Sequence, residues 1–206
     1  MPVHTEQKIK RVRVRVEYDQ SAESPRTYDN MGTLITMDRW GIEVEGKQRR
    51  DVNGVGARRM VHEYLRGESV AARADLPSSI HRGDGYEGFI YVTRATVVKE
   101  YGDASPASIA KALACITAEA ETFRAWCDGM AFGFTVETLE TCPECGNESI
   151  TDEDSCWGFI TNEPERDLGD WMGEHMDDSG RAALAIALAD GWTGDYPNAG
   201  TGTVPA

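Results

Sequence analysis

The residues best suited to metal chemistry are three cysteines in the last third of the chain. Cys142 and Cys145 enclose a Pro-Glu turn that Gly146 follows, and ten residues separate Cys145 from Cys156. Two thiolates at this spacing can hold one tetrahedral zinc ion, whose fourth ligand would be Cys127, His175 or a carboxylate. The spacing therefore predicts a structural zinc site at Cys142, Cys145 and Cys156. The alternatives are a tight turn with reduced thiols and a redox pair.

A polar loop near the N-terminus concentrates groups that make directed hydrogen bonds. It runs Glu-Ser-Pro-Arg-Thr-Tyr-Asp-Asn over residues 23–30, and Arg26 brings a planar guanidinium with several donors. Loops carry binding residues more often than cores do, so Arg26, Asp29 and Asn30 are candidate binding residues. The competing interpretation is an Arg–Asp pair that holds the loop in shape.

Hydrolytic and phosphoryl-transfer chemistry have little support. The four histidines share no motif, and the chain contains neither a zinc-protease helix motif, nor a nucleophile elbow, nor a phosphate-binding P-loop. The many carboxylates leave a two-metal nuclease open, but no spacing aligns them for one. The sequence therefore favours a binding protein over an enzyme.

The negative charge is confined to one part of the chain. The formal net charge is −14, and residues 136–206 hold 16 acidic residues against only Arg166 and Arg181. These carboxylates repel one another unless a cation or a basic partner lies nearby. The region is therefore either a solvated face or a surface that imitates a polyanion and docks a basic protein. The candidate binding residues here are Asp152, Glu153, Asp154, Asp167, Asp170, Glu174, Asp177 and Asp178.

The elements that must position these groups indicate an α+β protein with a mixed or antiparallel sheet. Strands are expected at residues 10–18, 32–37, 88–93, 131–139 and 155–160, and short helices at 56–65 and 94–101. Ser105 and Pro106 open one long helix to about Cys127. Its expected buried stripe consists of Ile109, Leu113, Ile116, Ala120, Phe123 and Cys127. Two acidic helices follow at 167–176 and 179–189. Residues 38–53, 77–88 and 141–154 are expected to be irregular.

The first strand carries a basic ladder on one face. Arg11, Arg13 and Arg15 alternate with valines, so the three guanidinium groups lie on the same side. They either grip phosphate or pair with acids on a neighbouring strand, and the second use is the commoner one.

The chain is expected to form three parts in the compartment that makes it. These are an α+β core at residues 1–165, an acidic helical extension packed on it at 166–193, and a flexible tail at 194–206. No stretch approaches the ~18 apolar residues of a membrane span, and the first residues lack a signal peptide's apolar segment. We therefore expect a cytoplasmic protein without a membrane partner.

Three segments together resemble a family of small proteins encoded by bacteriophages and prophages. They are residues 23–33 (Glu-Ser-Pro-Arg-Thr-Tyr-Asp-Asn-Met-Gly-Thr), 88–92 (Gly-Phe-Ile-Tyr-Val) and 154–159 (Asp-Ser-Cys-Trp-Gly-Phe). The resemblance covers about residues 10–165. This chain has Tyr28 where the family usually has Trp, and it adds an acidic C-terminal part. The resemblance implies an accessory protein acting in the host cytoplasm on host machinery, and several such proteins are acidic inhibitors that imitate DNA.

Two functional hypotheses follow. The first is an inhibitor or modulator whose acidic last third docks a basic, nucleic-acid-binding host defence protein; this last third is not expected to bind nucleic acid directly. The second is an enzyme or sponge that holds a nucleotide-like or phosphorylated small molecule in the loop at 23–30.

Overall fold

The chain folds into two compact units. The computed structural model describes residues 9–38, 41–47, 50–51, 54–76, 87–191 and 200–206. Unit 1 comprises residues 1–23 and 129–206, and unit 2 comprises residues 24–128. In the described ranges all strand pairs are antiparallel, and five α-helices accompany two sheets, which confirms the predicted α+β class. No helix in the described ranges is long and apolar enough to cross a membrane.

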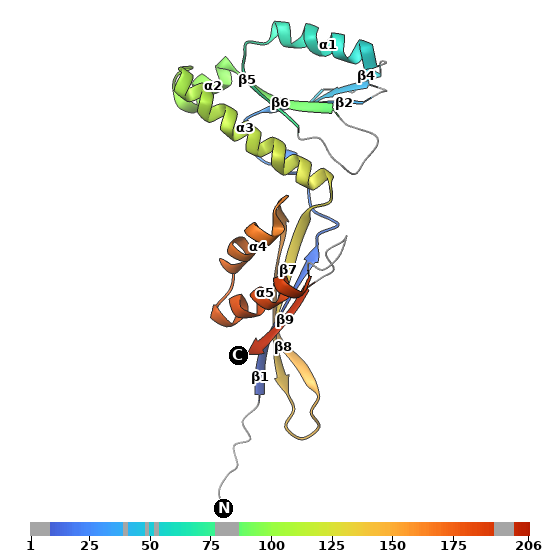
Figure 1. Ribbon diagram of the computed structural model, residues 1–206, viewed down its shortest axis with the longest axis vertical. Coiled ribbons are helices and arrows are strands. Elements are labelled where there is room, and N and C mark those ends of the chain that lie inside the picture. Colours follow the sequence, from blue (N-terminus) through green and yellow to red (C-terminus); the bar gives the residue numbers. More distant parts are fainter. Residues whose placement is uncertain (1–8, 39–40, 48–49, 52–53, 77–86, 192–199) are drawn as a thin grey trace, which may run out of the picture. The chain divides into compact units, whose positions relative to one another are not determined.

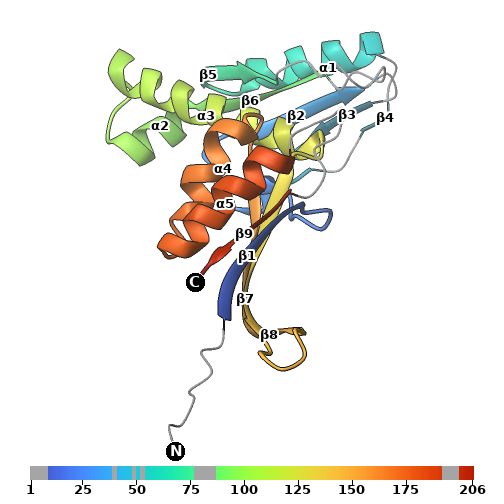
Figure 2. The ribbon, with the colours of Figure 1, turned by 60° about the horizontal axis from the view of Figure 1, so that its bottom comes forward.

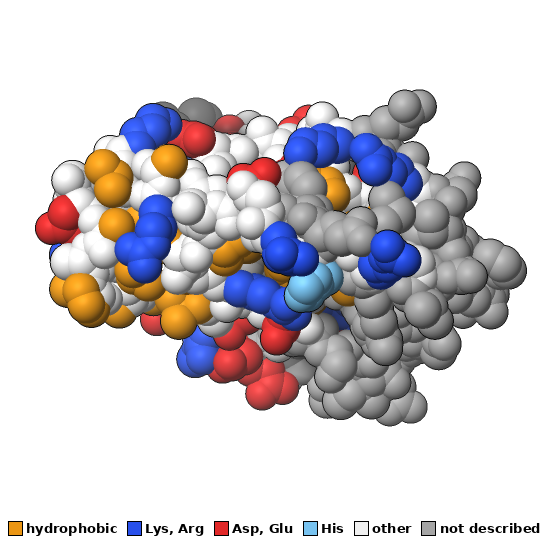
Figure 3. Space-filling model, turned by 90° about the horizontal axis from the view of Figure 1, so that it is seen from above, with side chains coloured by type: hydrophobic (Ala, Val, Ile, Leu, Met, Phe, Trp, Pro, Cys, Tyr) orange, Lys and Arg blue, Asp and Glu red, His pale blue; other side chains and the backbone are white. Residues whose placement is uncertain are grey.

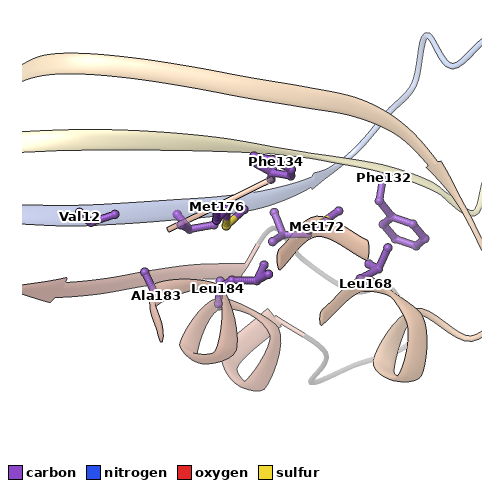
Figure 4. Close-up of a cluster of buried hydrophobic side chains, with 11 residues drawn as sticks. Val12, Phe132, Phe134, Leu168, Met172, Met176, Ala183 and Leu184 are labelled. Atoms are coloured by element: carbon purple, nitrogen blue, oxygen red, sulfur yellow. The ribbon is translucent and has the colours of Figure 1, made fainter. Parts of the chain in front are cut away.

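Unit 1 is a four-stranded sheet with helices on one face. The strand order is β8 (Glu148–Ile160), β7 (Ala131–Thr141), β1 (Ile9–Tyr18) and β9 (Gly200–Pro205). Helices α4 (Pro164–Gly173) and α5 (Asp178–Gly191) supply the second layer (Figure 2). The core lies between the layers, where Val12 and Phe134 of the sheet meet Met172 and Leu184 of the helices (Figure 4).

Gly202 allows α5 to lie directly on β9. A Cβ at this position would come within 1.9 Å of the Ala183 carbonyl oxygen, so only glycine permits this approach. The opposite face of this sheet carries no helix among the described residues of unit 1.

Unit 2 is a five-stranded sheet covered on both faces. The order is β4 (Arg50–Asp51), β3 (Gly41–Val44), β2 (Thr33–Asp38), β6 (Glu87–Thr93) and β5 (Val70–Asp75). Alternate residues Ile90 and Val92 pack toward α2 (Arg94–Tyr101) and α3 (Pro106–Cys127), whereas Phe89 and Tyr91 face α1 (Gly54–Gly67). Both faces of β6 are therefore buried, which explains its continuous apolar sequence (Figure 1).

The long helix begins where the sequence predicts. Ser105 accepts a hydrogen bond from the Ser108 backbone N–H, and Pro106 occupies the first turn. Asp103 accepts bonds from the Ser108 hydroxyl and the Ser105 backbone N–H, and these lower the pKa of Asp103 to about 2. The predicted buried stripe is only partly right. Ile116 and Ala120 are buried, but Leu113 is 41% exposed.

Two segments expected to be irregular contain strands. Residues 141–154 were expected to be a turn, but the turn ends at Asn147 and β8 then continues for 13 residues. Its first half is exposed on both faces, so no apolar alternation marks it. Residues 38–53 contain β3 and β4. Residues 77–86 of the predicted loop lie outside the described residues.

The ends of the chain also differ from expectation. Residues 200–205 lie within the segment expected to be a flexible tail, yet they form β9 and pair with β1 from Arg11 to Val16. Because β1 binds both β7 and β9, the N-terminal strand belongs with the C-terminal helices. The compact units therefore do not follow the expected boundaries at residues 165 and 193.

Candidate functional site

Arg26 lies at the centre of a partly buried hydrogen-bond network in unit 2. Its short 3-10 helix, η1 (Pro25–Thr27), is capped by Ser24, and its side chain is 8% exposed. The guanidinium donates to both carboxylate oxygens of Glu45 at 2.9 and 2.7 Å, and to Glu119 at 2.9 Å. It also donates to the Asn30 side-chain oxygen at 3.0 Å and the Gly32 carbonyl at 2.6 Å. All five of its N–H donors are used.

The two carboxylates of this network also bind backbone N–H groups. Glu119 accepts from Met31 at 2.6 Å and from Gly32 at 3.2 Å, and Glu45 accepts from Leu34 at 3.1 Å. Burial alone would lower the pKa of Arg26, but the hydrogen bonds to Glu45 and Glu119 outweigh it and raise that pKa. The network thus ties the loop at 23–33 to strand β2 and helix α3.

Close packing joins the first two segments of the family resemblance. A Cβ on Gly32 would come within 2.1 Å of an Ile90 methyl group and 2.9 Å of an Ile116 methyl group. The Asn30 side-chain NH2 group donates hydrogen bonds to the Pro25 and Tyr28 carbonyls. Of the three loop residues predicted to bind a ligand, Arg26 and Asn30 therefore hold the loop in shape, and only Asp29 is exposed.

Glu119 is the residue of this network that the sequence does not single out. It lies in a helical Ala-Glu-Ala-Glu run, where a glutamate is usually solvent-exposed. Cys115, one turn earlier, donates weakly to it at 3.8 Å. Burial, and then the nearby Glu119 carboxylate, raise the pKa of Cys115, so this thiol is a poor nucleophile.

The basic ladder of unit 1 is paired with acids on β7, the neighbouring strand, and at the start of β8. Arg13 and Arg15 bind the two oxygens of Glu137 at 2.5 and 2.6 Å, and Glu137 is 1% exposed. Arg11 pairs with Glu148 at 3.2 Å. Of the two uses considered for the ladder, phosphate binding and pairing with acids, the structure therefore shows pairing with acids.

Trp157, in the third segment of the family resemblance, lies flat against strand β7. A Cβ on Gly133 would come within 2.1 Å of the indole ring, so the ring occupies the space that this glycine leaves. The side chain is still 45% exposed, on the sheet face that the helices do not cover.

Seven of the eight carboxylates predicted to form an acidic surface are exposed on unit 1. Three of them follow one another on the edge strand β8, and the other four lie on or beside α4 and α5: Asp152, Glu153, Asp154, Asp170, Glu174, Asp177 and Asp178. In the described part of the chain, Asp178 alone among these seven is ion-paired, with Arg181 at 2.6 Å. Asp177 caps α5 by accepting from the Gly180 backbone N–H at 2.7 Å.

The eighth carboxylate, Asp167, has a structural role. It is 9% exposed, binds Arg166 at 2.7 Å and accepts from the Thr161 hydroxyl at 2.5 Å. The Arg166 guanidinium, followed by the Thr161 hydroxyl, lowers the pKa of Asp167. It is therefore not part of the acidic surface, which consists of the seven exposed residues.

The net charge is distributed unevenly between the two units. Unit 1 has 20 acidic and 7 basic residues, a balance of −13, whereas unit 2 has 15 and 14, a balance of −1. Figure 3 shows unit 2 from the side of α1, where Lys and Arg side chains are spread over the visible face. Arg59, His62 and Arg66 are exposed on that helix. Only unit 1 is strongly acidic.

The structure does not bring the three candidate zinc ligands together. Cys142 and Cys145 lie in the turn between β7 and β8, where the Cys142 backbone N–H donates to Asn147. Cys156 pairs with Phe134 and packs against the core, eight residues along β8 from Glu148, which is on the order of 20 Å of extended strand.

No other described residue completes the zinc site. Among the described residues, no group of three or more His, Cys, Asp or Glu could hold a metal ion. Of the possible fourth ligands, Cys127 ends α3, and His175 packs against Phe134 and Phe159. Zinc at Cys142 and Cys145 therefore stays a prediction, which the zinc content of the wild-type chain and of Cys142→Ser tests.

Comparisons with known protein families, curated proteins and solved structures find no match for this chain.

Proposed function

We propose that this protein is a phage-encoded accessory protein that inhibits or modulates a basic, nucleic-acid-binding host defence protein. The acidic surface of unit 1 would take the place of nucleic acid on that partner, in the host cytoplasm. The phage context rests on the three sequence segments that resemble the phage-encoded family.

The observation that carries the proposal is the exposure of carboxylates that lack cations. Arg166 and Arg181 are the only basic residues among the last 71, and Arg166 is bound to Glu163 and Asp167. Six of the seven exposed carboxylates therefore have no guanidinium or ammonium partner in the described ranges. A cationic groove would supply the missing counter-charges.

Binding of this kind needs many contacts at once. A single exposed ion pair contributes roughly 0–1 kcal/mol, so one carboxylate cannot create a useful affinity. Several carboxylates presented together accelerate association and make the affinity fall with salt. The same charge opposes DNA phosphates, because phosphate binding requires lysine and arginine to displace counterions.

The small-molecule hypothesis gains less support from the geometry. A phosphate at residues 23–30 would need donors from Arg26, whose N–H groups are all bound within unit 2. The phosphate would have to displace Glu45 or Glu119 from a guanidinium that is 8% exposed.

Capture of partners from host lysate tests the proposal with two matched variants. One variant carries Asp152→Asn, Glu153→Gln and Asp154→Asn in unit 1. The control carries Asp29→Asn, Glu43→Gln and Glu100→Gln, three exposed positions in unit 2. Both variants lose three negative charges, and circular dichroism confirms that both fold.

We expect the wild-type chain and the control to capture the same basic protein, with release at high salt. The unit 1 variant should capture at least tenfold less. Equal capture by both variants would contradict the proposal. In that case a rise in melting temperature with one nucleotide or phosphorylated compound would move the small-molecule hypothesis to first place.

A further inference from the structure

Strand β8 is the longest edge strand among the described strands. The sheet of unit 2 ends in β4, which has two residues, and in β5, which has six and a bulge between Val70 and Ala72. The other edge of the unit 1 sheet is β9, which has six residues and ends at Pro205. Short length, bulges and proline all discourage a further strand. By contrast, β8 has 13 residues, and its register with β7 is regular from Asp152 to Trp157.

The register identifies which backbone groups of β8 face outward. The Asp19 N–H donates to the Ala131 carbonyl, so odd-numbered residues of β7 bond toward β1. Because antiparallel strands alternate their bonding direction, even-numbered residues of β7 bond toward β8. Val136 and Thr138 are paired with Asp154 and Asp152. The intervening residues of β8, Glu153 and Ser155, therefore direct their N–H and C=O groups away from the sheet.

Two aspartates occupy the outward donors. The Glu153 N–H donates to the Asp152 side chain at 3.1 Å, and the Ser155 N–H donates to the Asp154 side chain at 2.8 Å. These bonds within the strand confirm that neither N–H is used by β7. They also cover the edge with negative charge, which opposes pairing between two copies of β8.

We propose that the outer edge of β8, from Asp152 to Trp157, accepts an extended basic segment of the partner protein as an additional strand. This inference rests on the proposed function and specifies how the acidic surface is used. A strand added to a sheet edge gains affinity from main-chain hydrogen bonds, and its side chains give specificity.

The charge of the edge selects a basic occupant. A lysine or arginine beside Asp152 or Asp154 attracts that carboxylate and releases the N–H group it covers. The carbonyls of the incoming strand then bind the N–H groups of Glu153 and Ser155. A neutral or acidic strand supplies no counter-charge, so the aspartates stay on the two donors.

The neighbouring side chains leave this edge open. The Trp157 ring lies over Gly133 and is thus directed toward β7 rather than outward. Asp152, Glu153, Asp154 and Ser155 are exposed. A strand of about six residues matches the regular stretch between the two bulges of the β7–β8 register.

The test uses a blocked synthetic peptide of eight alternating lysine and valine residues. A second peptide of the same sequence is N-methylated at two adjacent central residues. Because successive N–H groups of a strand point to opposite sides, this peptide loses one hydrogen-bond donor on each side. Binding is measured by calorimetry to the wild-type chain, Ser155→Pro and Ser155→Ala. Proline removes the outward N–H without changing the charge and is tolerated on an edge strand, while alanine keeps the N–H.

We expect the first peptide to bind the wild-type chain and Ser155→Ala within twofold. Its affinity for Ser155→Pro, and the affinity of the N-methylated peptide for the wild-type chain, should be at least tenfold lower. Failure of the first peptide to bind the wild-type chain would overturn strand addition. Equal binding of the two peptides would also overturn it. In either case, the variant with Asp152→Asn, Glu153→Gln and Asp154→Asn is also measured against the partner captured from lysate. If it binds that partner more weakly than the wild-type chain does, the acidic surface is still the binding site and only strand addition is wrong.

Hydrogen exchange on the wild-type chain decides the matter if Ser155→Pro does not fold. The amides of Glu153 and Ser155 should exchange at least tenfold more slowly with the first peptide bound. Unchanged exchange at both amides would overturn the inference.

Discussion

The Arg26 network of unit 2 and the acidic surface of unit 1 are both built from carboxylates, but the two sets have opposite roles. Glu45 and Glu119 each bind a buried guanidinium and at least one backbone N–H. Asp152, Glu153 and Asp154 are exposed and have no cation within the described chain. A buried carboxylate must be paired to remain charged, whereas an exposed one is stabilised by water and stays available to a partner. Burial, rather than residue type, separates a structural acid from a binding acid.

The two sheets show the same contrast. Helices cover both faces of the unit 2 sheet, so its polar groups must be satisfied internally. The unit 1 sheet has helices on one face, and its other face and its β8 edge carry charged side chains. An outward-facing function is therefore expected from unit 1.

The largest expected change in stability follows from replacing Arg26, and it distinguishes a structural role of this residue from a binding role. Arg26→Ala leaves Glu45 and Glu119 without their counter-charge and should lower the free energy of unfolding by about 3 kcal/mol. Arg66→Ala removes an exposed arginine from α1 and should change it by less than about 0.5 kcal/mol. Urea unfolding measures both. Equal stability of the two variants, with partner binding lost only in Arg26→Ala, would show that the loop is the binding site.

A smaller effect should separate two aspartates of one helix. Asp167→Asn weakens the bonds to Arg166 and Thr161 and should lower the melting temperature, whereas Asp170→Asn should leave it almost unchanged. Each variant removes one charge from α4, so the difference reports the surroundings of Asp167: its burial, its bonds to Thr161 and Arg166, and its place in the first turn of the helix. Scanning calorimetry at pH 7 measures it, and equal melting temperatures would remove Asp167 from the structural group.

The pH dependence of this difference has a definite sign. The Arg166 guanidinium, and then the Thr161 hydroxyl, lower the pKa of Asp167 in the folded chain. Its contribution is therefore complete above the ordinary aspartate pKa of about 3.9 and is lost as the pH falls through the lowered value. The gap between wild type and Asp167→Asn should shrink in the same calorimetric scans below about pH 4. A gap that widens there would contradict the assigned cause.

Local signals made much of the fold predictable. The N-cap Ser105 with Pro106 and the alternating valines of β1 each act within a few residues. The acidic stretch at 152–154 was also found correctly as exposed charge, because composition alone indicates it. These features depend on neighbours in the sequence.

Features that depend on distant partners were not predictable. β9 has almost no apolar residues and exists because it pairs with β1, about 190 residues earlier in the chain. Glu119 is 93 residues from Arg26, and nothing in its own helix marks it as buried. Asp167 resembles its exposed neighbours in sequence and differs only through Thr161 and Arg166.

The comparison between the two regions is tested most directly by partner affinity in two variants. One variant is Arg26→Ala, and the other carries Asp152→Asn, Glu153→Gln and Asp154→Asn. Calorimetry measures the affinity of each for the captured partner, at a temperature where circular dichroism shows that both variants are folded. We predict that Arg26→Ala binds within twofold of the wild-type chain, and that the unit 1 variant binds at least tenfold more weakly with a smaller dependence on salt. Weakened binding by Arg26→Ala together with unchanged binding by the unit 1 variant would contradict the account.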